Sequence, residues 1–462
     1  TTMTDNGTND FCPAIDCYNL SETSIQAYPD ISGNGVLIGF MGTAYLVLLL
    51  VIGNYFLAYD PTDCPFQSGN SKNENINREL WRPNPIDERF LRWVRKGPLV
   101  FADDTCARLQ MAFDESIIML CDVQVVTGLG ILISGFVLLR CGLDAIHWQI
   151  AVFLAWFSTV THLSGLEVLR THLNTYVWSK HLRFSLMSLL LILLLVGIVP
   201  TGFFSLRNKN FSSPAVCYFD LNYGFWRFKE TLGQSDFPEM QLERTPAYQA
   251  MVYSMVLLVL GFGTRSMKLL HPLSRTFKLN VRQPISSRVR RLLAAFAANT
   301  MASSERSKLL KTELILKPAL AGFFMVRLTF DFFSSSLFEV YWLCVILIWG
   351  TIKVLGTRNE LLGLIVTAVD EDQLTLAEAE NQWTFGQILP VILLFGPVFT
   401  IFGTFVHHIT KPDSADFRCE VYSDSGPNEA AMSGATVAPS RAASVGQDRR
   451  KHRRRMRNPK RP

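Results

Sequence analysis

Seven long apolar runs constrain the fold of this chain more than any other feature. They lie near 35–58, 116–139, 147–169, 184–206, 246–265, 334–356 and 385–407. Each is long enough to cross a hydrocarbon core of ~30 Å, which takes about 20 helical residues. Backbone that faces lipid must satisfy its hydrogen bonds within its own segment, so such runs form helices. The sequence therefore predicts an all-α, polytopic bundle of seven transmembrane helices in a lipid bilayer.

The composition fits a membrane protein better than a soluble one. Of the 462 residues, 49% are hydrophobic and 33 are phenylalanine, which is more than soluble domains usually contain. The first run is too long for the apolar part of a signal peptide, and residues 1–30 contain no Lys or Arg. We therefore expect this run to be a membrane span and not a cleaved signal.

The distribution of Lys and Arg predicts the orientation of the bundle, because connections rich in these residues stay in the cytosol. The N-terminal tail, 1–34, has no basic residue and five acids. Four stretches carry eight, three, twelve and twelve basic residues, and these are 59–115, 170–183, 265–317 and 408–462. All four lie on one side if the N-terminus is outside and the C-terminus is cytosolic.

This orientation divides the chain into three parts. Residues 1–34 form an extracellular or lumenal tail, 35–407 the membrane domain, and 408–462 a cytosolic tail. The C-terminal tail is poor in large apolar residues, so we predict that it is disordered. Within it, Arg441-Ala-Ala-Ser444 fits a basophilic kinase site, which makes Ser444 a candidate for phosphorylation.

The basic cytosolic segments predict partners on that side. Segment 282–317 interleaves basic and apolar residues, and the C-terminal tail ends in a basic cluster. Both patterns are typical of contact with anionic lipid headgroups. A cytosolic protein is a second class of partner. Seven membrane spans argue against a nucleic-acid partner.

The stretch before the sixth span admits two interpretations. Residues 318–333 are apolar but contain Arg327 and Asp331, which are four apart and can form an ion pair on a helix. We interpret this stretch as an interfacial helix leading into one span. A separate span would give eight and would place the basic tail outside, against the charge distribution.

Glycosylation motifs agree with the predicted orientation. The three Asn-x-Ser/Thr triplets that we consider begin at Asn6, Asn19 and Asn210. All three fall in segments predicted to lie outside, where N-glycosylation occurs. They are therefore candidate glycosylation sites in a secretory-pathway membrane, either the plasma membrane or another.

Four cysteines are also predicted to lie on the outer, oxidising side, and these are Cys12, Cys17, Cys141 and Cys217. An even number in such a compartment suggests disulfides. We consider a Cys141–Cys217 bridge that holds the large loop over the bundle, with a local Cys12–Cys17 bridge, although connectivity is not fixed by sequence. No cysteine or histidine spacing indicates a metal site, and no cofactor is implied.

Polar residues inside the spans are expensive in lipid and are therefore candidates for function. Span 2 carries Asp122 and Gln124, and span 3 carries Ser158, Thr161 and His162. Spans 2 and 3 run antiparallel across a short connection, which places Asp122 and His162 at similar depths. We therefore predict a contact between them. It would serve helix packing, or proton, ligand or gating chemistry, or catalysis.

Small residues and prolines predict how the helices pack. Gly35, Gly39 and Gly42 form a GxxxG-type stripe in span 1, and a second stripe in span 2 consists of Thr127, Gly130 and Ser134. Such stripes allow close helix approach. Pro390 and Pro397 predict kinks in span 7, which makes it the best candidate for a moving helix.

The region from span 2 to span 4 contains the stretches CDVQVVTGLGILISGF, HWQIAVFLAWFSTVTHLSGLEVLR and IVPTGFF. With these stretches the chain resembles a family of uncharacterised integral membrane proteins of filamentous fungi. The resemblance covers roughly residues 115–205 and implies a fungal source and seven spans. It implies no activity. Its motif positions are Asp122, Gln124, His147, Trp148, Gln149, Ser158, Thr161 and His162.

Comparison with better-known membrane classes leaves three functional hypotheses. A receptor-like or sensory protein is favoured by the outer tail and loop, the kinked seventh span and the large cytosolic segments, although the chain lacks DRY-like and NPxxY motifs. A transporter or membrane-embedded enzyme would use Asp122 and His162, but internal repeats and enzyme motifs are not found. The third hypothesis is a structural membrane scaffold.

Overall fold

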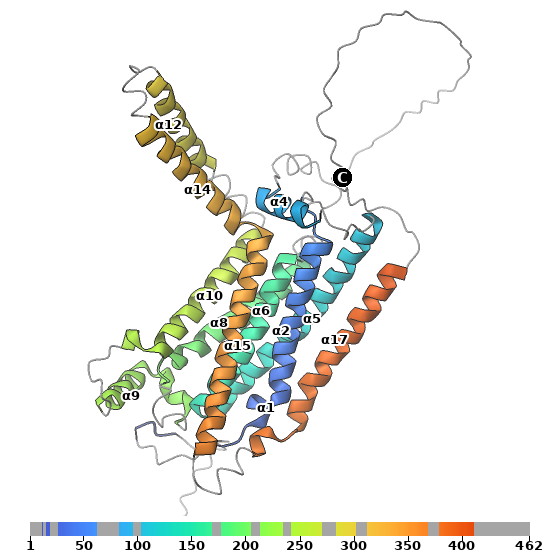
Figure 1. Cartoon of the computed structure of the whole chain (residues 1–462). Helices are drawn as coiled ribbons and strands as arrows, with labels where there is room; N and C mark the ends of the chain where they lie inside the picture. The colour runs from blue at the N-terminus through green and yellow to red at the C-terminus, as the bar shows by residue number, and fades with distance from the viewer. Residues whose placement is uncertain are drawn as a thin grey trace, which may run out of the picture. The chain divides into compact units, whose positions relative to one another are not determined.

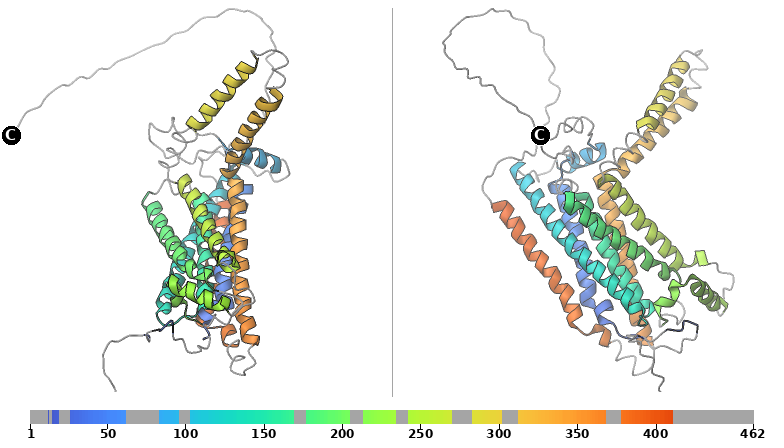
Figure 2. Two further views of the ribbon diagram at one scale, coloured as in Figure 1. Left: turned by 90° about the vertical axis from the view of Figure 1, so that its left-hand side faces the viewer. Right: turned by 180° about the vertical axis from the view of Figure 1, so that it is seen from behind.

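The structure is a computed structural model, and it describes residues 12, 15–18, 26–61, 83–95, 103–168, 177–204, 213–233, 242–269, 283–301, 312–367 and 378–410. Nearly all of these residues lie in helices (Figures 1 and 2). Within this part of the chain, β-structure is limited to an isolated antiparallel bridge between Asp144 and Pro214. The predicted all-α fold is confirmed.

Seven of the described helices are long and apolar enough to cross a membrane. They are α2 (Asn34–Leu57), which follows the short α1 (Pro29–Ser32), α5 (Asp103–Leu139), α6 (Ala145–Val168), α8 (Val177–Ile198), α10 (Pro246–Leu269), α15 (Ser336–Thr367) and α17 (Phe385–Thr410). The predicted number of spans is confirmed. Several helices extend beyond the predicted runs, because helices continue past the apolar stretch that crosses the lipid.

Helix α6 is the centre of the bundle, and α17 lies at its edge. In the most apolar stretch of each span, 94% of the α6 residues are buried, against 6% for α17. Two fully buried tryptophans on α6 bond to neighbouring backbones. The Trp148 indole N–H donates to the carbonyl of Gly197 at 3.0 Å, and that of Trp156 donates to Ile346 at 3.1 Å. Buried indoles need such partners.

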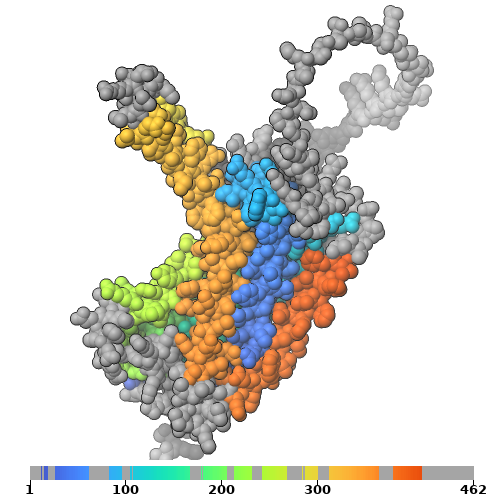
Figure 3. Space-filling model, in the orientation of Figure 1, coloured from blue at the N-terminus to red at the C-terminus, as the bar shows by residue number. Residues whose placement is uncertain are grey.

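The glycine stripe of the first span is confirmed as a close contact between α2 and α17. On the face shown in Figure 3, α2 lies between α15 and α17. A Cβ atom added at Gly39 would lie 2.5 Å from the Cβ of Pro390, and one at Gly42 would lie 2.9 Å from the Leu394 side chain. Helix α17 continues through Pro390 and Pro397 as one helix.

The prediction that Thr127, Gly130 and Ser134 form a close-packing stripe in the second span is wrong. A Cβ atom at Gly130 would have no neighbour within 4 Å, and Gly130 is exposed. The close approach to α6 occurs instead at Gly128, where a Cβ atom would lie 2.5 Å from Ser158. Two residues turn a helix by about 200°, so these glycines face opposite ways.

We expect Gly39→Ala to destabilise the protein by about 1–3 kcal/mol, because the added methyl group overfills the contact with α17. Gly130→Ala adds the same group where there is space, so it is the matched control. The free energy of unfolding in detergent should fall for the first variant only. Equal stabilities of the two variants would contradict the close α2–α17 contact.

Two disulfides fix the end of the bundle where α6 begins, which we call the cap end. Cys12 is bonded to Cys141 with a Cα–Cα distance of 4.9 Å, and Cys17 is bonded to Cys217 at 5.6 Å. Both predicted pairings, Cys141–Cys217 and Cys12–Cys17, are therefore wrong. The N-terminal segment lies against both the turn after α5 and η3 (Ala215–Phe219), so each tail cysteine meets a loop cysteine.

Helix α4 (Pro85–Val94) is bonded to the opposite end of the bundle, which we call the α4 end. The buried Asp87 carboxylate accepts hydrogen bonds from the Ser336 and Leu337 amides, at 2.8 and 3.0 Å, and thereby caps the start of α15. It also accepts one from the Tyr55 hydroxyl of α2 at 3.1 Å. Figures 1 and 3 show α4 lying across the end of α2.

The stretch before α15 is a separate helix, α14 (Lys317–Phe333), and it is not among the seven candidate spans. The predicted ion pair on it is confirmed, with 3.9 Å between Arg327 and Asp331. Asn84 joins α14 to α4, because its side-chain amide donates to the Asp331 carbonyl at 2.7 Å. The sixth span begins only after this junction.

Other predictions concern segments that are only partly described. Helices η4 (Leu242–Arg244) and α9 (Leu221–Gly233) belong to the loop after η1 (Val199–Gly202). Part of the basic segment 282–317 is helical, in α12 (Gln283–Met301) and the π-helical turn Thr312–Leu316. Asn6, Asn19, Asn210, Ser444 and most of the C-terminal tail lie outside the described residues.

Candidate functional site

The predicted contact between Asp122 and His162 does not form. Asp122 instead makes a bidentate ion pair with Arg183 of α8, at 2.8 and 2.7 Å. The neighbouring Cys121 faces α6, where its thiol donates to the Thr161 carbonyl at 3.3 Å. One residue turns a helix by about 100°, so Asp122 is directed away from His162 and toward α8.

His162 is 2% exposed, and neither ring nitrogen has a hydrogen-bond partner among the described residues. The hydroxyl of Ser158, one turn earlier on α6, is also buried without such a partner. Both side chains are buried on α6, the central helix of the bundle. The structure shows no polar site that joins them to Asp122.

The other two residues of the predicted cluster take part in helix packing. The Gln124 amide donates to the Phe40 carbonyl of α2 at 3.3 Å. The Thr161 hydroxyl donates to the Phe157 carbonyl within its own helix at 3.0 Å. The five predicted residues therefore serve different contacts and are not brought together as one site.

A different group of buried charges lies at the cap end, formed by Asp144, His147 and Glu380, and we call it the cap-end network. His147 is completely buried. Its Nδ1 lies 2.8 and 2.9 Å from the two carboxylate oxygens of Asp144, and its Nε2 lies 2.9 Å from Oε1 of Glu380. Ionised carboxylates only accept hydrogen bonds, so with Asp144 and Glu380 ionised both ring nitrogens are satisfied only as donors, which makes the imidazole a cation.

Two further groups bind the Glu380 carboxylate. The backbone N–H of Tyr28 donates to Oε1 at 2.8 Å, and the Ser32 hydroxyl donates to Oε2. The Ser32 carbonyl in turn accepts a hydrogen bond from Arg358 of α15 at 3.0 Å. Glu380 therefore joins the N-terminal segment, α6 and the segment before α17 at one buried carboxylate.

Tyr28 and Gln387 make further contacts around the cap-end network. The Tyr28 ring packs edge-on against His147 with 5.2 Å between ring centroids. Burial, together with the Asp144 charge, raises the pKa of the Tyr28 phenol, so it stays neutral. Gln387 accepts a hydrogen bond from the Gly35 amide at 3.3 Å and donates to the Gln382 carbonyl at 2.6 Å.

The network is suited to mechanical coupling. Its side chains hydrogen-bond one another, and the described residues contain no group of three or more His, Cys, Asp or Glu placed to hold a metal ion. The disulfides fix the N-terminal segment to the loops at the cap end. Glu380 therefore connects this cap to the segment that leads into α17.

A second buried ion pair lies toward the α4 end. Arg265 of α10 and Glu339 of α15 are 1% and 4% exposed, and their charged groups lie 3.0 Å apart. The guanidinium also donates to the Gly261 carbonyl at 3.1 Å. This pair ties the fifth span to the start of the sixth.

Sequence reasoning missed Glu380 for a physical reason. Glu380 stands 233 residues from His147, in a connection with six acids, where a solvated charge is the usual interpretation. Its burial depends on the return of α17 beside α2, which no local pattern indicates. His147 belongs to the HWQ stretch that carries the resemblance, and the local signal for its pairing is Asp144, three residues earlier.

Comparisons of the chain with protein-family models, with curated proteins and with solved structures gave no match. The resemblance to fungal membrane proteins therefore stays a prediction.

We expect Glu380→Ala to lower the free energy of unfolding by about 3 kcal/mol or more, because it leaves the buried His147 cation without one of its two anionic partners. Glu378→Ala removes the same type of side chain from an exposed position two residues away, so it should change stability little. Denaturant unfolding in detergent measures both. Similar losses for the two variants would contradict the burial of the network.

Proposed function

We propose that this membrane protein is receptor-like or sensory, with the cap end as its input and the α4 end as its output. The observation that carries the proposal is the hydrogen bond between His147 and Glu380. This hydrogen bond joins α6, the most buried span, to the segment that leads into α17, the least buried span. A signal that moves the cap would therefore move α17.

The packing of α17 supports this assignment. Between Phe385 and His407, only Gln387 and Pro397 are buried. The helix contacts α2 along the glycine stripe and α5 through Phe405, whose ring packs edge-on against Phe113 at 5.0 Å. Because α17 contacts the bundle on one side only, fewer packed side chains would have to separate for it to move than for the central α6.

We further propose that the cap end is outside and the α4 end is in the cytosol. The two disulfides support this, because they form in oxidising compartments. The charge distribution agrees, since the described connections at the α4 end belong to segments rich in Lys and Arg. In this orientation the basic segment 282–317 and the tail after 410 can contact anionic lipid headgroups or a cytosolic protein.

The alternative functions have less structural support. A transporter or enzyme centred on Asp122 and His162 would need these side chains in one polar site, and Asp122 is engaged by Arg183 instead. A structural scaffold is favoured by one observation, the dense packing of α6. The scaffold and the sensor differ in whether α17 responds to the cap.

The sensor hypothesis predicts that Glu380→Gln changes the position of α17 near the α4 end. Spin labels on unnatural amino acids at Met111 of α5 and Phe402 of α17, both exposed, report the distance between these helices. Phe402 lies roughly 25 Å along the helix from Phe385. Pulsed electron paramagnetic resonance should show a shifted or broader distance distribution than in the unsubstituted chain.

Glu378→Gln is the control and should leave the distribution unchanged. In a static scaffold, Glu380→Gln would disturb only the cap end, so an unchanged Met111–Phe402 distribution would contradict the sensor hypothesis. Retained helicity in circular dichroism shows that the variants remain folded.

The proposed orientation predicts opposite labelling of two exposed tryptophan positions. Trp383 at the cap end is 56% exposed and Trp93 at the α4 end is 72% exposed. In intact cells, a membrane-impermeant maleimide should label Trp383→Cys and not Trp93→Cys, whereas both should react after permeabilisation. If only Trp93→Cys were labelled in intact cells, the α4 end would be outside, and the proposed orientation would be wrong.

A further inference from the structure

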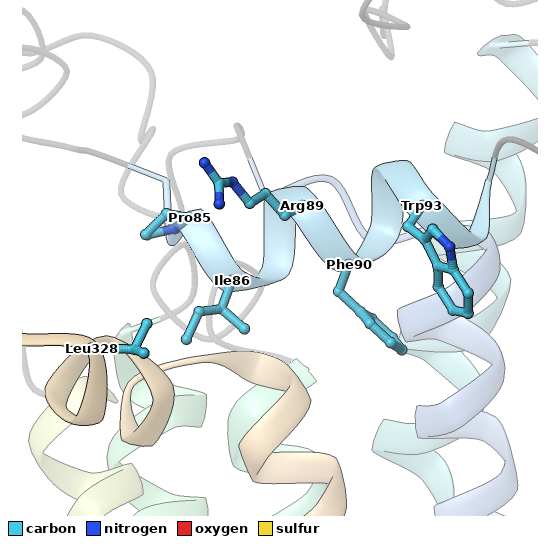
Figure 4. A pocket seen from close by; sticks show the side chains of 6 residues that line it. All are labelled: Pro85, Ile86, Arg89, Phe90, Trp93 and Leu328. Carbon is cyan, nitrogen blue, oxygen red and sulfur yellow. The ribbon is translucent and has the colours of Figure 1, made fainter. Parts of the chain in front are cut away.

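An apolar hollow of about 350 Å³ lies between α4 and α14. Its lining is Pro85, Ile86, Arg89, Phe90 and Trp93 of α4, with Leu328 of α14. Figure 4 shows Ile86 and Phe90 on one side of α4 and the guanidinium of Arg89 on the opposite side. The hollow is therefore lined mainly by apolar side chains, and the Arg89 guanidinium lies on the other face of α4.

The position of the hollow is fixed by polar contacts. Asp87 bonds α4 to the first amides of α15, and Asn84 bonds it to the last turn of α14. Helix α4 therefore lies where α2 ends and α15 begins. In a bilayer this level is the boundary between acyl chains and headgroups.

The residues of α4 match that boundary. Trp93 is 72% exposed, and tryptophans at this depth usually contact the headgroup region. Arg92 is paired with Glu88 on the same helix. Arg89 is exposed and has no ion pair with a described residue. Among the residues that line the hollow, the only basic one is therefore Arg89, whose guanidinium reaches the headgroup side of α4.

We infer that this hollow binds an anionic phospholipid of the cytosolic leaflet, with one acyl chain against Phe90, Trp93 and Leu328 and the phosphate on Arg89. An apolar surface alone would accept any lipid, whereas the unpaired guanidinium selects a negative headgroup. The inference rests on the orientation proposed above. The maleimide experiment tests that orientation separately, so failure of one proposal is distinguishable from failure of the other.

Native mass spectrometry of the full chain in detergent tests the inference with two lipids, phosphatidylglycerol and phosphatidylcholine. Arg89→Gln should weaken phosphatidylglycerol binding about fivefold, which is the usual effect of one basic residue at an anionic surface. Arg92→Gln, which removes a charge already paired with Glu88, is the matched control and should weaken it less than twofold. Phosphatidylcholine binding should be unchanged in both variants.

A second measurement locates the acyl chain. Phosphatidylglycerol with a photoactivatable group on its chain should cross-link to the peptide containing residues 85–93 or to that containing Leu328, and Trp93→Ala should reduce this yield. If Arg89→Gln and Arg92→Gln weakened phosphatidylglycerol binding equally, the inference would be overturned. Cross-links confined to other helices, or a protein bound at the hollow in place of lipid, would also overturn it.

Discussion

The buried imidazole of His147 is the contact on which the arrangement of the cap end depends. It lies between two carboxylates, those of Asp144 on the approach to its own helix and Glu380 before α17. A buried cation of this kind is tolerated only when its anionic partners are held in place. The disulfides, the Tyr28 amide and the Ser32 hydroxyl provide that fixation, because they join the N-terminal segment to the cap end and to Glu380.

At each end of the bundle, one buried carboxylate accepts hydrogen bonds from several helices. At the cap end, Glu380 accepts hydrogen bonds from the start of the first span and from α6. At the α4 end, Asp87 accepts hydrogen bonds from the start of the sixth span and from Tyr55. In both cases one buried carboxylate at the end of the bundle fixes the ends of helices that are distant in sequence. Between these ends α17 contacts α2 and α5 on one side only, and we propose that a perturbation at the cap reaches the other end along this helix.

The sequence was sufficient to predict the spans, because hydropathy reports directly on the lipid environment of each segment. It also predicted the α2 stripe of Gly35, Gly39 and Gly42, and the separate helix before the sixth span. It failed where side chains from distant segments meet. Depth in the membrane pairs Asp122 with His162, whereas the direction of each side chain around its helix decides the actual partner, Arg183. The disulfide pairings and Glu380 depend on the path of the N-terminal segment and the return of α17, and neither has a local signature.

A double-mutant cycle between His147 and Glu380 tests the central claim most directly. The unfolding free energies of His147→Ala, Glu380→Ala and the double variant, measured in one detergent, give the interaction energy of the pair. If the two side chains stabilise each other across α6 and the approach to α17, the double variant should lose at least about 1 kcal/mol less than the sum of the single losses. Additive losses would show that the two side chains act independently, and would contradict the coupling of the cap to the seventh span.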